Sequence, residues 1–124
     1  MIEELITRVF AVRNVTHLAH WKTRSYAAHM ALGSFYESVV EALDGIVECY
    51  QGESGLVSVP AGRVISARIT EVAPDDVVDL LRDEADWIQA NREEIAGNNS
   101  ALQNLIDELL AQYYTTIYKL EFLA

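Results

Sequence analysis

The chain has 124 residues, 51% of them apolar, which is enough for one hydrophobic core and too few for two domains. Its net charge of −10 includes only nine scattered lysine and arginine residues, so no nucleic-acid partner is expected. Charged residues make up 23% of the chain and apolar residues are spread along it, so neither a disordered chain nor a membrane-spanning one is expected.

Two long helices are predicted in the first half of the chain. The first spans about residues 2–22, because apolar residues recur there every three or four positions. The second spans about residues 26–51. Ser25 is expected to cap its start, and Gly52 is expected to end it.

Two further helices are predicted in the second half. The third spans about residues 75–96, and Gly97 is expected to end it as a C-terminal cap. The fourth spans about residues 100–122 and has the most regular apolar spacing of all. Ser100 and Gln103 have the spacing of a capping box, which predicts how this helix begins.

The connections between the helices predict how the chain is arranged. The first and second predicted helices, and likewise the third and fourth, are joined by only a few residues, which favours antiparallel helical hairpins. Residues 52–74 are long enough to cross the bundle, which would make the second and third helices parallel. We therefore predict an all-α, single-domain chain with the ferritin-like four-helix order. Residues 56–59 and 63–69 alternate in the β manner, so the crossover is expected to contain a small β-hairpin or an extended strap.

The amino terminus and the cysteine content bear on where the protein is found. The first residues lack a basic region followed by an uninterrupted apolar stretch, so no export signal is predicted. Cys49 is the single cysteine and cannot form a disulfide within the chain, which is typical of a reducing compartment. We expect a cytoplasmic protein.

The candidate metal ligands are three histidines and two acidic residues. His17, His20 and His29 are the only histidines of the chain, and Asp44 and Glu48 follow one helical turn apart on the second helix. Imidazole nitrogens combined with carboxylate oxygens suit iron, manganese or zinc. The sequence contains no Glu-x-x-His pair, so a diiron site inside one bundle is not expected.

These residues resemble the Dps family of miniferritins. The resemblance rests on the run His20-Trp21, the run Tyr26-Ala27-Ala28-His29, and the positions of Asp44 and Glu48. It implies a ferroxidase site at a two-fold interface, where His20 and His29 of one subunit and Asp44 and Glu48 of its mate bind iron. It also implies that peroxide or oxygen oxidises this iron.

The chain departs from the Dps pattern in several respects. Gly33 stands where the family has an acidic ligand, and glycine has no side chain to coordinate metal. The turn between His20 and His29 is shorter than in the family, and no lysine-rich amino-terminal tail is present. The chain is also shorter than typical members, so a hollow twelve-subunit cage is not carried over.

A second resemblance is to small phage-encoded proteins, and it covers nearly the whole chain. It rests on His20-Trp21, on the pattern Ser-Tyr-Ala-x-His that ends at His29, and on Tyr50-Gln51-Gly52. No function comes with it. If the protein is phage-encoded, the expected location is the host cytoplasm.

The alternative function is a non-enzymatic binding module that sequesters a small nucleotide or binds a host protein. Arg13, Lys22 and Arg24 could grip a phosphate while Tyr26 stacks on a base. A purely structural role would use neither this set nor the metal ligands.

Each candidate ligand also has a simpler interpretation. His17 is interpreted as a hydrogen-bonded structural residue, and Asp44 and Glu48 could be an ordinary solvated helix face. A homo-oligomer, at least a dimer, is expected in every case. The reason is that one small bundle does not readily bury the aromatic residues Trp21, Tyr26, Phe35 and Tyr36 of the first two helices.

Overall fold

The computed structural model describes residues 1–65 and 72–124, which are helical or irregular throughout. Four long helices make up most of the chain: α1 (Ile2–Lys22), α2 (Tyr26–Ser54), α4 (Val77–Ala96) and α5 (Ser100–Tyr118). Three short segments are α3 (Ala61–Ile65), the 3₁₀ turn η1 (Pro74–Asp76) and the π-helical end η2 (Lys119–Leu123). The predicted all-α class is confirmed.

The ends of α2 show one prediction confirmed and one wrong. The Ser25 hydroxyl accepts a hydrogen bond from the Ala28 amide at 3.1 Å, so Ser25 caps the helix as predicted. The helix does not stop at Gly52. It continues to Ser54 and ends at Gly55, whose φ of +94° strongly favours glycine. A glycine at φ below zero can continue a helix, and Gly52 does so.

The turn between α4 and α5 also differs in detail from the prediction. Gly97 ends α4 with a φ of +58°, as expected for a C-terminal cap. The N-cap of α5 is Asn99 and not Ser100, because the Asn99 side chain accepts from the Leu102 amide at 3.2 Å. Gln103 donates its side-chain amide to the Gly97 carbonyl at 2.7 Å, so the predicted capping box is wrong.

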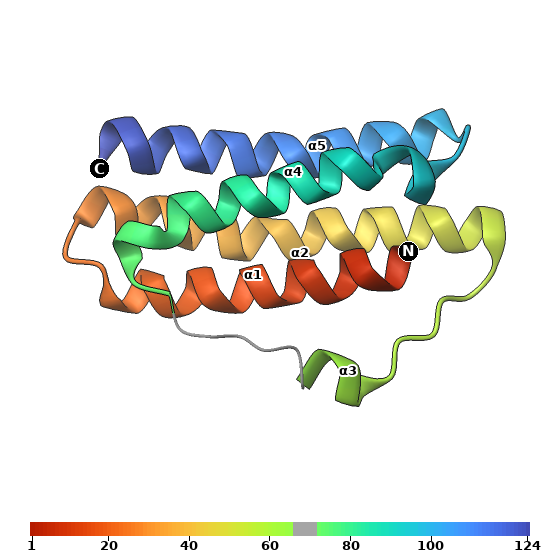
Figure 1. The fold of residues 1–124 in the computed structure, drawn as a ribbon, viewed down its shortest axis with the longest axis horizontal. Coiled ribbons are helices and arrows are strands. Elements are labelled where there is room, and N and C mark those ends of the chain that lie inside the picture. The colour runs from red at the N-terminus through yellow and green to blue at the C-terminus, as the bar shows by residue number, and fades with distance from the viewer. Residues whose placement is uncertain (66–71) are drawn as a thin grey trace.

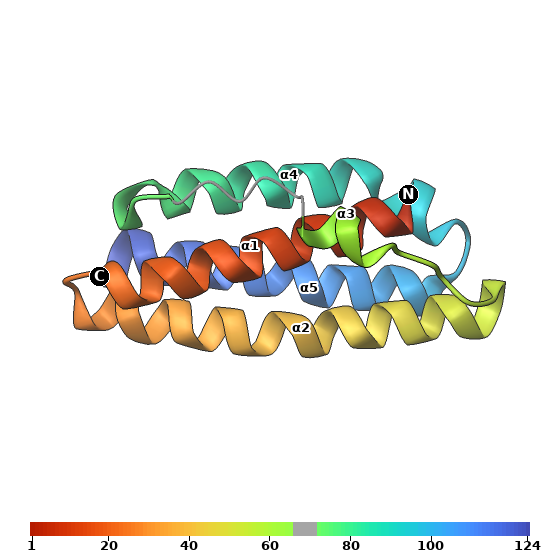
Figure 2. The same ribbon diagram turned by 90° about the horizontal axis from the view of Figure 1, so that it is seen from below.

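The four long helices pack side by side around one core (Figure 1). Contacts join α1 to α2, α2 to α5, α5 to α4, and α4 to α1, so each helix has two neighbours. Seen from below, α2 and α4 lie on opposite sides, with α1 and α5 between them (Figure 2). α1 and α2 are antiparallel, as are α4 and α5, whereas α2 and α4 run in the same direction.

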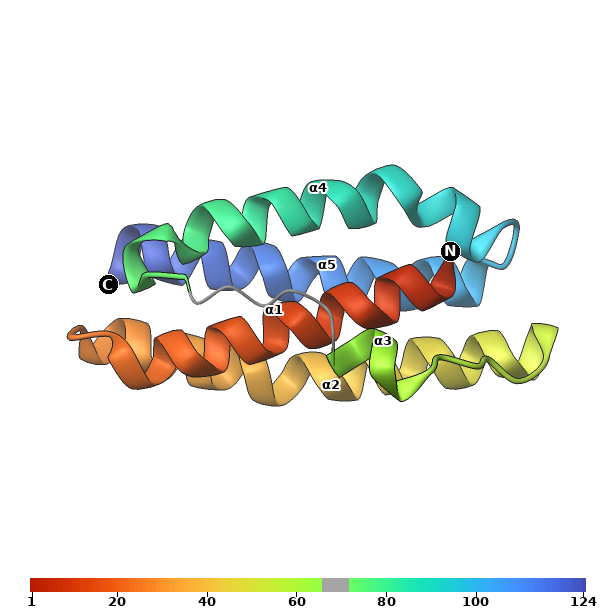
Figure 3. The same ribbon diagram turned by 60° about the horizontal axis from the view of Figure 1, so that its bottom comes forward.

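α2 ends at one end of the bundle and α4 begins at the other, so the long connection between them joins opposite ends of the bundle (Figure 3). Within its described part, residues 61–65 form helix α3, and no strand is present, so the predicted β-hairpin is wrong there. The rest of the predicted alternation, residues 66–69, lies outside the described residues. A crossover that contains a helix satisfies its main-chain groups locally and needs no partner strand. The narrower assignment to the ferritin-like superfamily stays a prediction.

A network of charged side chains attaches the crossover to the bundle. Arg63 of α3 donates to the Glu4 carboxylate at 3.0 Å, and Glu4 also accepts from Arg8 at 3.2 Å. Arg8 then reaches across to α4, where it donates to both oxygens of Glu84 at 2.9 and 3.2 Å. The Arg8 guanidinium lies 4.4 Å from the centre of the Trp87 ring. These contacts connect α1, α3 and α4.

The core is apolar along the whole bundle. Its largest fully buried side chains include Tyr113 and Phe35, whose rings meet edge to face at 5.1 Å across the α2–α5 contact. Among the described residues, no helix is both long enough and apolar enough to cross a membrane. α1 and α2 lie beside each other, and the predicted metal ligands His20, His29, Asp44 and Glu48 are all on these two helices.

Candidate functional site

His20 and His29 lie directly against each other where α1 ends and α2 begins. Their imidazole rings stack with 3.7 Å between centroids and 16° between planes. The contact is reciprocal. His20 Nδ1–H donates to the main-chain carbonyl of His29 at 2.6 Å, and His29 Nδ1–H donates to the carbonyl of His20 at 2.9 Å. The structure thus brings together the two histidines that the sequence predicted as ligands from one subunit.

This arrangement determines which ring nitrogen is available. A carbonyl oxygen can only accept, so the hydrogen bond requires a proton on Nδ1 of both His20 and His29. In a neutral imidazole the other nitrogen, Nε2, then has the lone pair. Histidines that ligate metals are commonly oriented in this way, with the second nitrogen bonded to a carbonyl or carboxylate. Both rings could therefore offer Nε2 to a ligand.

Gly33 has a structural role that the sequence prediction missed. A Cβ atom built at Gly33 would lie 3.0 Å from His20 Cε1 and 3.2 Å from His20 Nδ1. The His20 ring thus occupies the space in which a side chain at position 33 would begin. The acidic residue expected there from the Dps pattern would displace this ring. A glycine inside a helical pattern is the sequence signal that could have indicated such a close approach.

The close approach at Gly33 leads to a testable expectation for Gly33→Ala. Alanine is favoured over glycine in a helix by about 1 kcal/mol, and Gly52→Ala on the same helix should show a gain of this kind because a Cβ there has nothing within 4 Å. We expect Gly33→Ala to lose the gain, since its methyl group pushes against His20. Urea unfolding of both variants, with NMR of the histidine rings, measures the difference. Equal stabilisation with unchanged His20 resonances would contradict the close approach of this ring to Gly33.

A cluster of aromatic side chains continues from this pair along α1. His17 stacks on Tyr36 at 3.9 Å, contacts Trp21 at 4.6 Å, and lies 6.3 Å from His20. Partial burial lowers the pKa of His17, and nearby Arg13 and His20 lower it further. His17 is therefore neutral at pH 7. Its ring contacts Tyr36 and Trp21, and no hydrogen bond of this ring is found within the described residues, so the hydrogen-bonded structural role stays a prediction.

Asp44 and Glu48 lie much farther along α2. Both are exposed, and neither forms an ion pair or side-chain hydrogen bond within the described residues. At about 1.5 Å per residue, Asp44 is about 22 Å and Glu48 about 28 Å from His29 along the helix. Accordingly, the described residues contain no group of three or more His, Cys, Asp or Glu side chains that could hold a metal ion. One chain alone does not bring the four predicted ligands together.

The four residues of the nucleotide alternative are only partly gathered. A hollow of about 500 Å³ lies between the α1–α2 turn and η1, and it is lined by Lys22, Thr23, Arg24, Ser25, Pro74 and Asp75. Arg13 is not part of it, because its guanidinium lies over the Tyr36 ring at 5.2 Å. Tyr26 is 77% exposed and does not line the hollow either. Asp75 would also repel a phosphate placed there.

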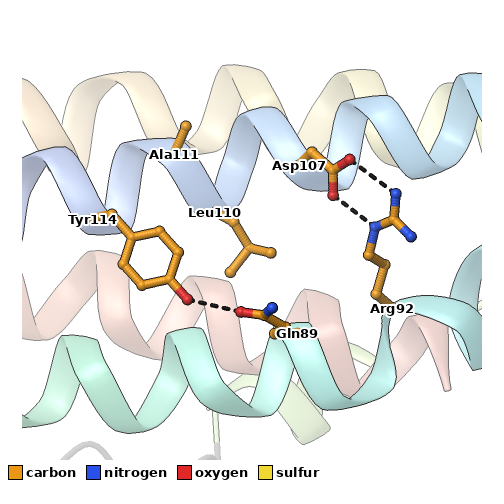
Figure 4. A pocket seen from close by; sticks show the side chains of 6 residues that line it. All are labelled: Gln89, Arg92, Asp107, Leu110, Ala111 and Tyr114. Carbon is orange, nitrogen blue, oxygen red and sulfur yellow. Dashed lines mark hydrogen bonds and ion pairs between the residues drawn. The ribbon is translucent and has the colours of Figure 1, made fainter.

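A second hollow, of about 410 Å³, lies between α4 and α5 (Figure 4). Its polar side chains are paired with one another. Arg92 donates to both oxygens of Asp107 at 2.6 and 2.9 Å, and Tyr114 donates to Gln89 at 2.9 Å. These pairs connect α4 to α5 across the apolar floor of the hollow, so the polar groups there stabilise the bundle and are already engaged.

The Arg92–Asp107 pair predicts a measurable titration. Its hydrogen bonds hold the pKa of Asp107 below the ordinary value and raise the pKa of Arg92. A lowered carboxyl pKa stabilises the fold above the unfolded pKa, and this contribution disappears as the pH falls through the folded pKa. We expect Arg92→Met to raise the pKa of Asp107, measured from its carboxyl carbon by NMR. An unchanged titration would mean that the pair does not persist in solution.

Comparison with known proteins finds a similar protein encoded by a phage. It is 25% identical over 118 residues to the "Uncharacterized 14.6 kDa protein in mobD-ri intergenic region" of Enterobacteria phage T4, covering 95% of this chain and 86% of that protein. No solved structure matches the chain. Residues 20–120 match the family described as "Family of unknown function (DUF5856)". The match includes His20, His29, Asp44 and Glu48, and the chain belongs to the DUF5856 family.

Proposed function

We propose that this protein binds a metal ion in a site completed by a second copy of the chain. The main supporting observation is the His20–His29 pair, in which both Nδ1 atoms are engaged by main-chain carbonyls and both Nε2 atoms are left for a ligand. Two imidazoles alone rarely hold a metal firmly, and carboxylate ligands are the common complement. Exposed acids without ion pairs on the same helix are suitable candidates.

The geometry of α2 favours sharing between two chains. His29 and Asp44 are separated by about 60° around the helix axis and by about 22 Å along it. They cannot meet within one chain, but in a dimer with two-fold symmetry they meet when the second α2 runs antiparallel to the first. A two-fold axis near the middle of this stretch, close to Tyr36, would place the acids of each chain opposite the histidines of the other. His20 and His29 would then act with Asp44 and Glu48 of the mate.

The donor set suits iron, manganese or zinc. With iron the activity would be that of a ferroxidase, in which peroxide or oxygen oxidises bound ferrous iron. The missing acid at Gly33 reduces the ligand set relative to the Dps pattern, so we propose one ion per site at most. We also propose that the protein is located in the host cytoplasm.

Metal analysis of protein purified without a metal-affinity tag tests the proposal. After exposure to ferrous iron, manganese or zinc and removal of excess ions, the wild type should retain stoichiometric metal. His29→Ala and Asp44→Ala should both lose it. His17→Ala and Asp83→Ala are the matched controls, because they remove a histidine and an exposed acid outside the proposed site. A wild type that retains no metal would contradict the proposal.

The second candidate is a non-enzymatic binding module, and the hollow at the α1–α2 turn is the observation that favours it. Lys22 and Arg24 line this hollow together with two hydroxyl side chains, which are suitable contacts for a phosphate group. Calorimetric titration with ATP as the probe, comparing the wild type with the Lys22→Ala/Arg24→Ala variant, examines it. Heat of binding that disappears in the variant would support this candidate, and no heat with the wild type would remove the nucleotide version.

A further inference from the structure

A shallow groove follows the outside of the α2–α5 contact. Three adjoining hollows form it, of about 360, 190 and 280 Å³, and adjacent hollows share lining residues. Ser34 and Lys119 line the first two, and Ser38 and Gln112 line the last two. On α2 the lining extends from Ala27 to Gly45, which is about 27 Å at 1.5 Å per residue. This length matches about five turns of a helix.

The lining of this groove on α2 consists mainly of small side chains. They are Ala27, Ala31, Ser34, Ser38, Ala42 and Gly45, and the larger side chains that also line it on α2 are Met30, Phe35 and Glu41. Small residues let two helices approach closely. In this chain, however, α5 does not fill the space beside these small residues, and the groove remains open there. In the middle of the groove, the Ser38 hydroxyl donates a hydrogen bond to the Gln112 side chain at 2.9 Å.

Gly45 is a second, independent observation. It lies inside α2, its φ is not positive, and a Cβ built on it meets nothing within 4 Å. The chain by itself therefore gives no reason for glycine here, although glycine is less favourable than alanine in a helix by about 1 kcal/mol. Gly33 differs, because the His20 ring needs its space. A close neighbour from outside the chain would explain Gly45.

The charges at the edge of the groove indicate which neighbour fits. Lys119 lines it on one side of the Ser38–Gln112 contact, and Glu41 and Glu108 line it on the other. None of these three side chains forms an ion pair within the described part of the chain. A two-fold axis through the Ser38–Gln112 contact would exchange the two sides. Lys119 of each copy would then face Glu41 and Glu108 of the other.

We infer that the α2–α5 groove is a self-association surface, in which a second copy of this chain packs antiparallel with Gly45 at the helix contact. The surface differs from the one in the proposed metal site, which uses the His20–His29 side of α2. The inference does not depend on metal binding. In a two-fold contact the same surface of both copies takes part, so this surface must be complementary to itself. The positive charge on one side of the groove and the negative charges on the other meet this requirement.

Analytical ultracentrifugation of the full chain over a range of concentrations, with EDTA present to remove metal-dependent pairing, tests the inference. The wild type should dimerise, and Gly45→Leu should weaken the dimer at least about tenfold. Gly52→Leu is the matched control. Gly52 is also an open glycine of α2, but it does not line the groove, so its replacement should leave the dimer unchanged. Circular dichroism confirms that both variants are folded.

A charge exchange provides the second arm. Lys119→Glu should weaken the dimer, and adding Glu41→Lys and Glu108→Lys to it should restore the association. A wild type that stays monomeric at every concentration would overturn the inference. A dimer that is unaffected by Gly45→Leu would also overturn it, because the copies would then pair through another face.

Discussion

Phe35→Ala is expected to lower the free energy of unfolding by about 3–5 kcal/mol, the range for truncating a buried aromatic ring. Phe35 is 1% exposed, and its ring packs edge to face on Tyr113, so the substitution leaves a cavity at the α2–α5 contact and removes an aromatic pair. A domain of this size is stable by about 5–15 kcal/mol, so the variant would lose a large part of its stability. Urea unfolding followed by circular dichroism measures the change.

Phe122→Ala is the matched control for this prediction. Phe122 is 71% exposed at the π-helical end of the chain, and its loss should change the stability by no more than about 0.5 kcal/mol. Phe35→Leu keeps most of the volume and should fold even if the alanine variant does not. A Phe35→Ala variant as stable as Phe122→Ala would contradict the packing between α2 and α5.

Mixed dimers of His29→Ala and Asp44→Ala chains are expected to recover about half of the wild-type metal content, although each variant alone retains none. In a shared site, one of the two positions of the mixed dimer combines the lost histidine with the lost acid. The other position combines the intact histidines of one chain with the intact acids of its mate. Co-expression with two different tags and sequential purification isolates the mixed dimers for metal analysis.

Mixed dimers of His29→Ala with His20→Ala are the control for this complementation. Both chains then lack a histidine on the same side of the site, so neither position is complete and no metal should return. Equal metal in the two kinds of mixed dimer would show that the ligands are not divided between subunits as proposed. Such a result would direct the search to the hollow lined by Lys22 and Arg24.

The helical architecture of this protein could be predicted from its sequence because it depends on local properties. Apolar residues at helical spacing predicted four long helices, and α1 begins and ends at the predicted residues. Ser25 and Gly97 act where their chemistry predicts, since an N-cap hydroxyl and a positive φ are properties of single residues. The local pattern did not determine which of two nearby glycines, Gly52 or Gly55, ends α2, and the predicted end at Gly52 was wrong.

The tertiary structure decided how the candidate ligands are arranged. The sequence indicated that His20 and His29 belong together, but their stacking and reciprocal hydrogen bonds depend on how α1 turns into α2. The sequence also indicated that Gly33 cannot supply a metal ligand, whereas the structure shows that this glycine makes room for the His20 ring. Spacing along a helix determines which side a residue faces, but only the packing of helices determines which atoms meet. For that reason α1 and α2 could be predicted from the sequence, whereas the contact between His20 and Gly33 could not.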